Sequence, residues 1–270
     1  MKKRFNVLKF ILVFILILPL LISWIPSHCF EKITPEILKE GNYIDLLFAS
    51  FKELSLTLIT TLIFAMFISI LLGYLSVLSM KVGRFFSNIM NGIESVPSIL
   101  IALFCYAPVS GVLARSKGNA SEWVSLMVFV LAATATTLPE AVRSITIPLS
   151  DLYNRKYSVS FRSYGFPKRR ILSVLMKTDL MLDTIKRVAA GILLKTLVLD
   201  TSFGFVIQVG FGTYGTPAHL SPGALIAANR GILLGFATEG NPLFFWLPSL
   251  FLITISVAFL IILNDNKEVA

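Results

Sequence analysis

Histidine and cysteine are scarce in this sequence of 270 residues, which holds only two of each. A structural zinc site typically needs four such ligands at close spacing. The sequence offers no such spacing, so we expect no metal site. Cys29 lies next to a predicted outer loop and Cys105 inside an apolar run, so we expect no disulfide either.

Sequence motifs for catalysis are missing as well. The chain has no Gly-x-x-x-x-Gly-Lys-Ser/Thr phosphate-binding loop, so we do not expect it to hydrolyse ATP itself. No nucleophile, base and acid set is visible, which disfavours an intramembrane enzyme. We therefore predict no catalytic residue and no cofactor in this chain.

Apolar residues, in contrast, make up 56% of the chain, and charged residues only 14%. Several apolar runs approach the roughly 20 residues that a helix needs to span a bilayer. The pattern predicts an all-α polytopic membrane protein with six transmembrane helices, at about 8–26, 54–78, 88–110, 123–142, 188–210 and 243–263. We divide the chain into an N-terminal transmembrane helix with its outer loop, 1–50, and a transmembrane domain, 51–265.

The net charge of +9 is explained by where the basic residues lie. They gather before the first predicted span, after the second, and between the fourth and fifth, at 2–9, 81–84 and 143–187. With six spans these regions share one side of the membrane, which the positive-inside rule makes cytoplasmic. Both termini are then cytoplasmic, and the charge does not indicate a nucleic-acid partner.

One segment inside the predicted cytoplasmic loop at about 143–187 has a pattern typical of regular secondary structure. An apolar face recurs there at helical spacing, at Tyr157, Phe161 and Tyr164. Gly165 stands where a left-handed residue ends a helix, and Pro167 follows where a helix cannot continue. A second apolar stripe beside basic residues follows at 168–176. We predict a helix–turn–helix hairpin, which either docks a partner or lies on anionic lipid.

Three charged residues fall within the predicted spans, where burying a charge is expensive: Glu94, Lys195 and Asp200. Glu94 is expected near the cytoplasmic start of the third span. Lys195 and Asp200 are five positions apart in the fifth span, which strains a direct pair, so we expect other helices to supply partners. These residues either line a water-filled translocation path or fix the bundle by pairing between helices.

Several short segments carry a resemblance to a known family. Val159-Ser160-Phe161, three residues and then Gly165 have the spacing of a Glu-Ala-Ala-x-x-x-Gly loop, although only the Gly is kept. Further matching segments follow the same order along the chain, at 94–100, 202–210, 221–230 and 246–248. Together they resemble a divergent C-type permease subunit of a binding-protein-dependent ABC importer of the dipeptide, oligopeptide and nickel type.

The resemblance implies a type I ABC importer permease fold with a cytoplasmic coupling hairpin, in the bacterial inner membrane. It implies a second permease subunit, ATP-binding ABC subunits that hydrolyse ATP, and an extracytoplasmic solute-binding protein, besides the lipid bilayer. The solute would be small, such as a peptide or nickel. The implied ATPase-coupling residues are Tyr157, Ser160, Phe161, Arg162, Tyr164, Gly165 and Arg169.

Other functions fit part of the pattern. Phosphate-type ABC permeases also have a Val-Pro-Ser third span and are the nearest alternative. An ATP-independent secondary transporter or channel would explain the spans and their charges equally well, but not the hairpin. A structural subunit at the membrane surface would need no ATPase at all.

Overall fold

The computed structural model describes residues 2–30, 43–113, 119–207, 221–233 and 241–264. These ranges are helical and contain no strand, as the sequence predicts. Their elements are α1 (Lys2–Ile22), the 3-10 helix η1 (Ser27–Phe30), α3 (Tyr43–Leu78), α4 (Met80–Glu94), α5 (Ser98–Leu113), α6 (Asn119–Asn154), α7 (Lys156–Ser163), α8 (Lys168–Leu175), α9 (Asp179–Ile207), α10 (Pro222–Leu233) and α11 (Leu243–Asn264).

Four stretches of the described chain are long and apolar enough to cross a membrane: Tyr43–Leu78, Val124–Asn154, Asp179–Val206 and Leu243–Asn264. A fifth crossing results if α4 and the start of α5 count as one bent span. Helix α1 adds a shorter apolar stretch, Phe10–Ile22. The chain is thus an all-α protein with several helices suited to a membrane, and α1 would have to supply the sixth crossing.

Three of these helices are longer than the sequence predicts. Helix α3 begins at Tyr43, before the predicted start at 54, and crosses the domain boundary predicted at residue 50. Helix α6 continues to Asn154, beyond the predicted end at 142, and α9 begins at Asp179, before the predicted start at 188. Hydropathy marks only the part of a helix that suits lipid, whereas backbone hydrogen bonds continue into polar residues. Much of the predicted cytoplasmic loop is therefore an extension of α6 and α9.

The predicted third span, 88–110, is not one straight helix. The structure has two helices there, α4 and α5, which meet at 89° across a break at 95–97. Pro97 has no N–H to donate and disfavours a helical conformation at Val96, so α4 ends before this pair. Helix α4 starts early because only Ser79 separates it from α3.

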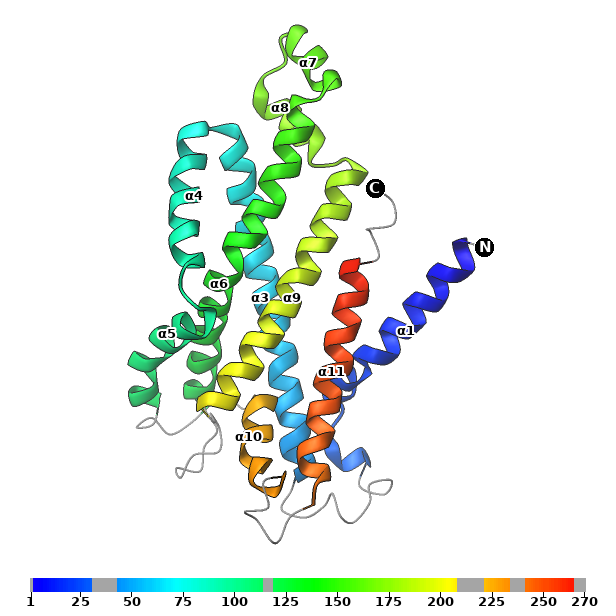
Figure 1. Cartoon of the computed structure of the whole chain (residues 1–270), viewed down its shortest axis with the longest axis vertical. Helices are drawn as coiled ribbons and strands as arrows, with labels where there is room; N and C mark the ends of the chain where they lie inside the picture. Colours follow the sequence, from blue (N-terminus) through cyan, green and yellow to red (C-terminus); the bar gives the residue numbers. More distant parts are fainter. Residues whose placement is uncertain (1, 31–42, 114–118, 208–220, 234–240, 265–270) are drawn as a thin grey trace.

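Helices α3, α6 and α9 pack against one another at the centre of the bundle (Figure 1). A Cβ atom on Gly73 of α3 would meet the Ile145 side chain of α6 at 2.8 Å, so the glycine lets these helices approach closely. On the other side, the Tyr106 ring of α5 lies 5.2 Å from the Phe203 ring of α9. Helix α10 packs between α9 and α11.

The α7–α8 hairpin lies at one end of the long helices, beyond the ends of α6 and α9 (Figure 1). The start of α4, with Lys81 and Arg84, lies at the same end. Two of the three basic regions thus share one end of the bundle, as the charge distribution predicts.

Candidate functional site

The hairpin begins with a tight junction between α6 and α7. Helix α6 ends at Asn154, and the next residue, Arg155, is extended. The Ser158 hydroxyl is buried and donates a hydrogen bond of 2.8 Å to the Leu152 carbonyl of α6. This bond fixes the direction in which α7 leaves the longer helix.

The turn of the hairpin closes without help from outside. Gly165 has a φ of +79°, as predicted for a left-handed residue at a helix end. The Phe166 N–H donates to the Phe161 carbonyl at 3.2 Å, and the Gly165 N–H donates to the Arg162 carbonyl at 3.0 Å. The Phe161 and Phe166 rings meet edge to face at 5.9 Å. This combination is a Schellman motif with its hydrophobic contact.

Helix α8 is the anchored half of the hairpin. Its apolar stripe, predicted from the sequence, is buried against α3, α6 and α9 at Ile171, Leu172 and Leu175. The Tyr74 hydroxyl of α3 also donates to the Arg169 carbonyl at 3.1 Å. The backbone of α8 is therefore held to the bundle on several sides.

Helix α7 is the projecting half, and its apolar side chains are exposed. We define the α7 patch as Tyr157, Val159, Phe161, Tyr164 and Phe166, whose exposed fractions run from 36% to 80%. Basic groups lie beside it: the Arg170 guanidinium lies 5.0 Å from the Phe166 ring, and Arg162 of α7 is exposed and lies 4.7 Å from the Tyr153 ring of α6. The patch is thus apolar and aromatic with a cationic rim.

The predicted coupling residues do not share one environment. Ser160 is exposed and its hydroxyl donates only to the Lys156 carbonyl of its own helix, at 3.3 Å. The Arg169 side chain is exposed while its carbonyl is held by α3. The others lie in the patch, at its rim or at its turn: Tyr157, Phe161, Arg162, Tyr164 and Gly165.

Glu94 is not at the cytoplasmic start of a span, and that prediction is wrong. It is the last residue of α4, which has already run 15 residues from the hairpin end of the bundle. There it forms an ion pair of 2.8 Å with Arg143 of α6, which also donates to the Asn91 amide oxygen at 3.0 Å. The early start of α4 moves Glu94 away from the end.

Lys195 pairs with a residue of another helix. This was expected, because its spacing of five positions from Asp200 strains a direct pair within α9. Its ammonium group forms an ion pair with the Glu140 carboxylate of α6, and both side chains are about half exposed. Both lie near the middle of their apolar stretches, Val124–Asn154 and Asp179–Val206. An exposed ion pair at this depth is costly in lipid, so water or protein must cover it.

Asp200 lies elsewhere and is fully buried. The Ser221 hydroxyl donates to its carboxylate at 3.0 Å and joins α9 to the start of α10. Two glycines bring these helices together, because a Cβ on Gly204 would meet Ser221 and one on Gly223 would meet the Thr201 carbonyl. Asp200 therefore holds α10 in place, as expected of a charge that fixes the bundle.

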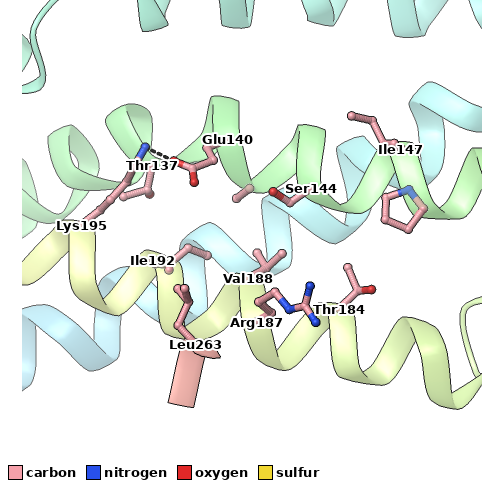
Figure 2. Close-up of a pocket in the computed structure, with 13 residues that line it drawn as sticks. Thr137, Glu140, Ser144, Ile147, Thr184, Arg187, Val188, Ile192, Lys195 and Leu263 are labelled. Carbon is pink, nitrogen blue, oxygen red and sulfur yellow. Dashed lines mark ion pairs between the residues drawn. The ribbon is translucent and has the colours of Figure 1, made fainter. Parts of the chain in front are cut away.

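A cavity of about 370 Å³ lies between α6 and α9 (Figure 2). Its polar lining comes from both helices, at Thr137, Glu140, Ser144, Thr184, Arg187 and Lys195. Figure 2 shows the Glu140–Lys195 pair at one end and Thr184 and Arg187 toward the other. Lys195 is thus both paired and on the wall of a cavity, so the two predicted roles are compatible. Asp200 does not line this cavity.

The sequence points to Glu94, Lys195 and Asp200 but does not identify their partners, which are Arg143 for Glu94, Glu140 for Lys195 and Ser221 for Asp200. The available signal was charge of opposite sign in or beside another predicted span: Glu140 lies inside the fourth, and Arg143 directly follows it. Which charge pairs with which depends on helix packing, which the sequence pattern leaves open.

No model of a known protein family matches the chain, and no curated protein matches it. Within the described residues, no group of three or more His, Cys, Asp or Glu side chains is placed to hold a metal ion. The candidate functional sites are the hairpin and the charged groups between the long helices.

Proposed function

We propose that the chain is a permease subunit of an ATP-driven ABC importer, with six transmembrane helices and the type I permease fold. It passes a small solute, delivered by an extracytoplasmic binding protein, into the cytoplasm. ATP is hydrolysed on separate subunits, which dock on the α7–α8 hairpin. The observation that carries the proposal is the α7 patch, an apolar surface left exposed on a hairpin that is otherwise anchored.

The position of the patch favours a protein partner over lipid. Asn154, where α6 meets the hairpin, is 14 residues beyond Glu140 near the middle of the span. At 1.5 Å per residue this is roughly 20 Å, more than half the thickness of the hydrocarbon layer. The patch then lies outside the apolar part of the bilayer. Large apolar side chains left exposed outside the hydrocarbon layer mark an interaction site.

The anchoring of α8 supports a coupling role. A partner that moves the α7 patch also moves α8, whose buried residues pack on α3, α6 and α9. Two of these helices, α6 and α9, carry the Glu140–Lys195 pair. Movement of the hairpin can therefore bias the bundle between two arrangements, which is the physical content of ATP-driven alternating access.

The sharp bend between α4 and α5 supports the presence of a second permease subunit. The residues of the break, 95–97, are exposed in this chain, and so is the neighbouring Glu94–Arg143 pair. Irregular backbone and charges near the middle of a bilayer are tolerated only against protein or water. A second subunit on this face would provide that cover, as expected for one half of a heterodimeric pore.

The test co-expresses the chain with ABC ATPase subunits and measures how much ATPase is recovered with it. Phe161→Ala removes an anchor of the patch, and Gly165→Val disturbs the turn behind it, so both variants should lose most of the bound ATPase. Val174→Ala is the matched control, because Val174 is an exposed apolar residue of α8 outside the patch.

The outcomes separate the alternative functions. Loss of ATPase in the two patch variants, with normal recovery in Val174→Ala, supports the importer. Equal recovery in all variants would contradict the coupling role. If the wild type binds no ATPase at all and its isolated hairpin peptide binds anionic vesicles, the ATP-independent transporter or surface subunit is the better description.

A further inference from the structure

A second cavity, of about 390 Å³, lies between α3, α4 and α6, and we call it the α4 cavity. Along α4 its lining runs from Met80, in the first turn, to Asn91, in the last turn. The start of α4 lies at the hairpin end of the bundle (Figure 1). At 1.5 Å per residue the lined part of α4 is roughly 16 Å long. The α4 cavity is therefore an elongated groove that leads from the hairpin end toward the middle of the apolar helices.

Arg84 gives the hairpin end of this cavity a positive charge that no carboxylate in the described chain neutralises. Within the described residues, the polar contact of its guanidinium group is to the Met80 sulfur, at 3.9 Å. The other arginine that lines the cavity, Arg143, is already paired with Glu94 at 2.8 Å. No Asp or Glu is among the described residues that line the cavity, and Asp151, near the end of α6, is not one of them. An anionic group would balance the charge of Arg84.

Hydrogen-bond donors lie beside this charge. Ser76 of α3 and Ser87 of α4 line the cavity, and within the described chain neither hydroxyl has a hydrogen-bond partner. Ser87 is one helical turn from Arg84. Gly83 lets α4 pack directly on the end of α3, because a Cβ there would meet the Ser76 carbonyl at 2.7 Å. A planar guanidinium group and two hydroxyls are donors that suit the oxygens of a phosphate group.

The depth of the cavity fits a lipid better than a free ion. Ile147 lines it and is seven residues beyond Glu140, which places this end roughly 10 Å from the middle of the span. Half of the hydrocarbon layer is about 15 Å thick, and an arginine side chain can extend to the headgroups from there. Deeper along the groove the lining includes Met90 and Val142. A charged end at headgroup depth and an apolar groove below it match the two parts of a phospholipid.

We propose that the α4 cavity binds an anionic phospholipid, with the headgroup phosphate at Arg84, Ser76 and Ser87 and an acyl chain in the groove between α4 and α6. Basic pockets between spanning helices are typical sites for anionic headgroups. The positive-inside rule assigns this lipid to the cytoplasmic leaflet. The inference does not rest on the importer function, because it needs only that these helices cross a membrane. A lipid at Arg84 and a second subunit at the break, 95–97, occupy opposite ends of α4, so both fit.

The first experiment measures lipid affinity by native mass spectrometry of the full-length protein. Phosphatidylglycerol and phosphatidylcholine are titrated separately in about 0.3 M salt, which screens attraction between distant exposed charges. Arg84→Gln should weaken binding of the first phosphatidylglycerol about tenfold, because a hydrogen-bonded charge is lost. Lys81→Gln is the matched control. It removes an equal charge from the same turn, but Lys81 is exposed and does not line the cavity, so binding should weaken by less than about twofold.

The second experiment locates the lipid in vesicles. A bimane label is attached to Phe85→Cys in full-length protein with Cys29→Ser and Cys105→Ala, because Phe85 is exposed beside Arg84 without lining the cavity. Brominated phosphatidylglycerol should quench the label at least about twofold more than brominated phosphatidylcholine. Adding Arg84→Gln should remove this preference. A label at Leu71→Cys, on an exposed part of α3 outside the cavity, should be quenched equally by both lipids.

Inorganic phosphate in the first experiment distinguishes a free anion from a lipid. Phosphate in large excess should displace little phosphatidylglycerol, since it has no acyl chain to fill the groove. Full displacement would overturn the lipid in favour of free phosphate. Equal affinity for the two lipids, or equal losses in Arg84→Gln and Lys81→Gln, would overturn the site itself. None of these results depends on the recovery of ATPase subunits, so failure of the lipid site is distinguishable from failure of the importer function.

Discussion

The two short helices of the hairpin differ in what covers their apolar residues. Each has eight residues, and each carries an apolar stripe beside arginine and lysine. In α8, Leu172 is fully buried in the bundle, whereas in α7 Phe161 is 46% exposed. Amphipathic pattern predicted both helices, but it does not tell whether the covering partner is the same chain or another molecule. The structure separates a buried stripe, which serves folding, from an exposed stripe, for which we propose docking.

The largest change in the free energy of unfolding is expected in α8, where a substitution removes packing and so tests its difference from α7. Leu172→Ala removes a fully buried side chain and should lower the free energy of unfolding by about 2–5 kcal/mol. Denaturant titration in detergent, followed by tryptophan fluorescence, measures the change. Val174→Ala, on the exposed side of the same helix, should change it by less than about 0.5 kcal/mol. Equal effects would mean that α8 is not anchored.

The next effect concerns the turn between the two helices. Gly165→Val places a branched side chain at a φ of +79° and should cost about 1–2 kcal/mol. The cost is conformational, because a Cβ at this position would meet no atom within 4 Å. Gly92→Ala is the control: its Cβ is equally free, but Gly92 is helical, so the variant should be neutral or slightly more stable. The same titration checks both.

A smaller effect is expected at the junction of α6 and α7. Ser158→Ala removes the buried hydrogen bond to the Leu152 carbonyl and should destabilise the protein by about 1 kcal/mol. Ser160→Ala removes only an exposed bond within α7 and should have little effect. Proteolysis of the hairpin should be faster in Ser158→Ala than in Ser160→Ala. Identical rates would show that the junction does not fix α7.

The smallest change in stability is predicted for the patch itself. Phe161→Ala leaves the bundle untouched and loses one ring contact with Phe166, so unfolding should change by less than about 0.5 kcal/mol. The same variant should nevertheless show the greatest loss of bound ATPase. A large loss of stability in Phe161→Ala would break the comparison, because α7 would then also serve folding.

Much of the fold could be predicted from the sequence because lipid imposes long apolar runs. The positions of α3, α6, α9 and α11 follow from hydropathy, and Gly165 and Pro167 mark the hairpin turn. The sharp bend between α4 and α5 did not follow, since hydropathy continues across the break at 95–97. A proline such as Pro97 breaks or kinks a helix, but the size of the bend depends on what packs around it.

The candidate site was predictable in part for a similar reason. Charges inside apolar runs are rare, so Lys195 and Asp200 stand out in the sequence. The sequence does not show that their environments differ, because one turn of a helix decides whether a side chain faces a cavity or a neighbouring helix. Lys195 faces Glu140 and the cavity, whereas Asp200 faces Ser221.

The Schellman turn at Gly165 has a kinetic consequence for any partner of the hairpin. Its hydrogen bonds and the Phe161–Phe166 contact shape the patch before contact, so little conformational entropy is lost on association. Binding then needs no folding step, and the encounter rate is set by diffusion and by the cationic rim. Added salt should therefore slow association with an acidic partner far more than it speeds dissociation.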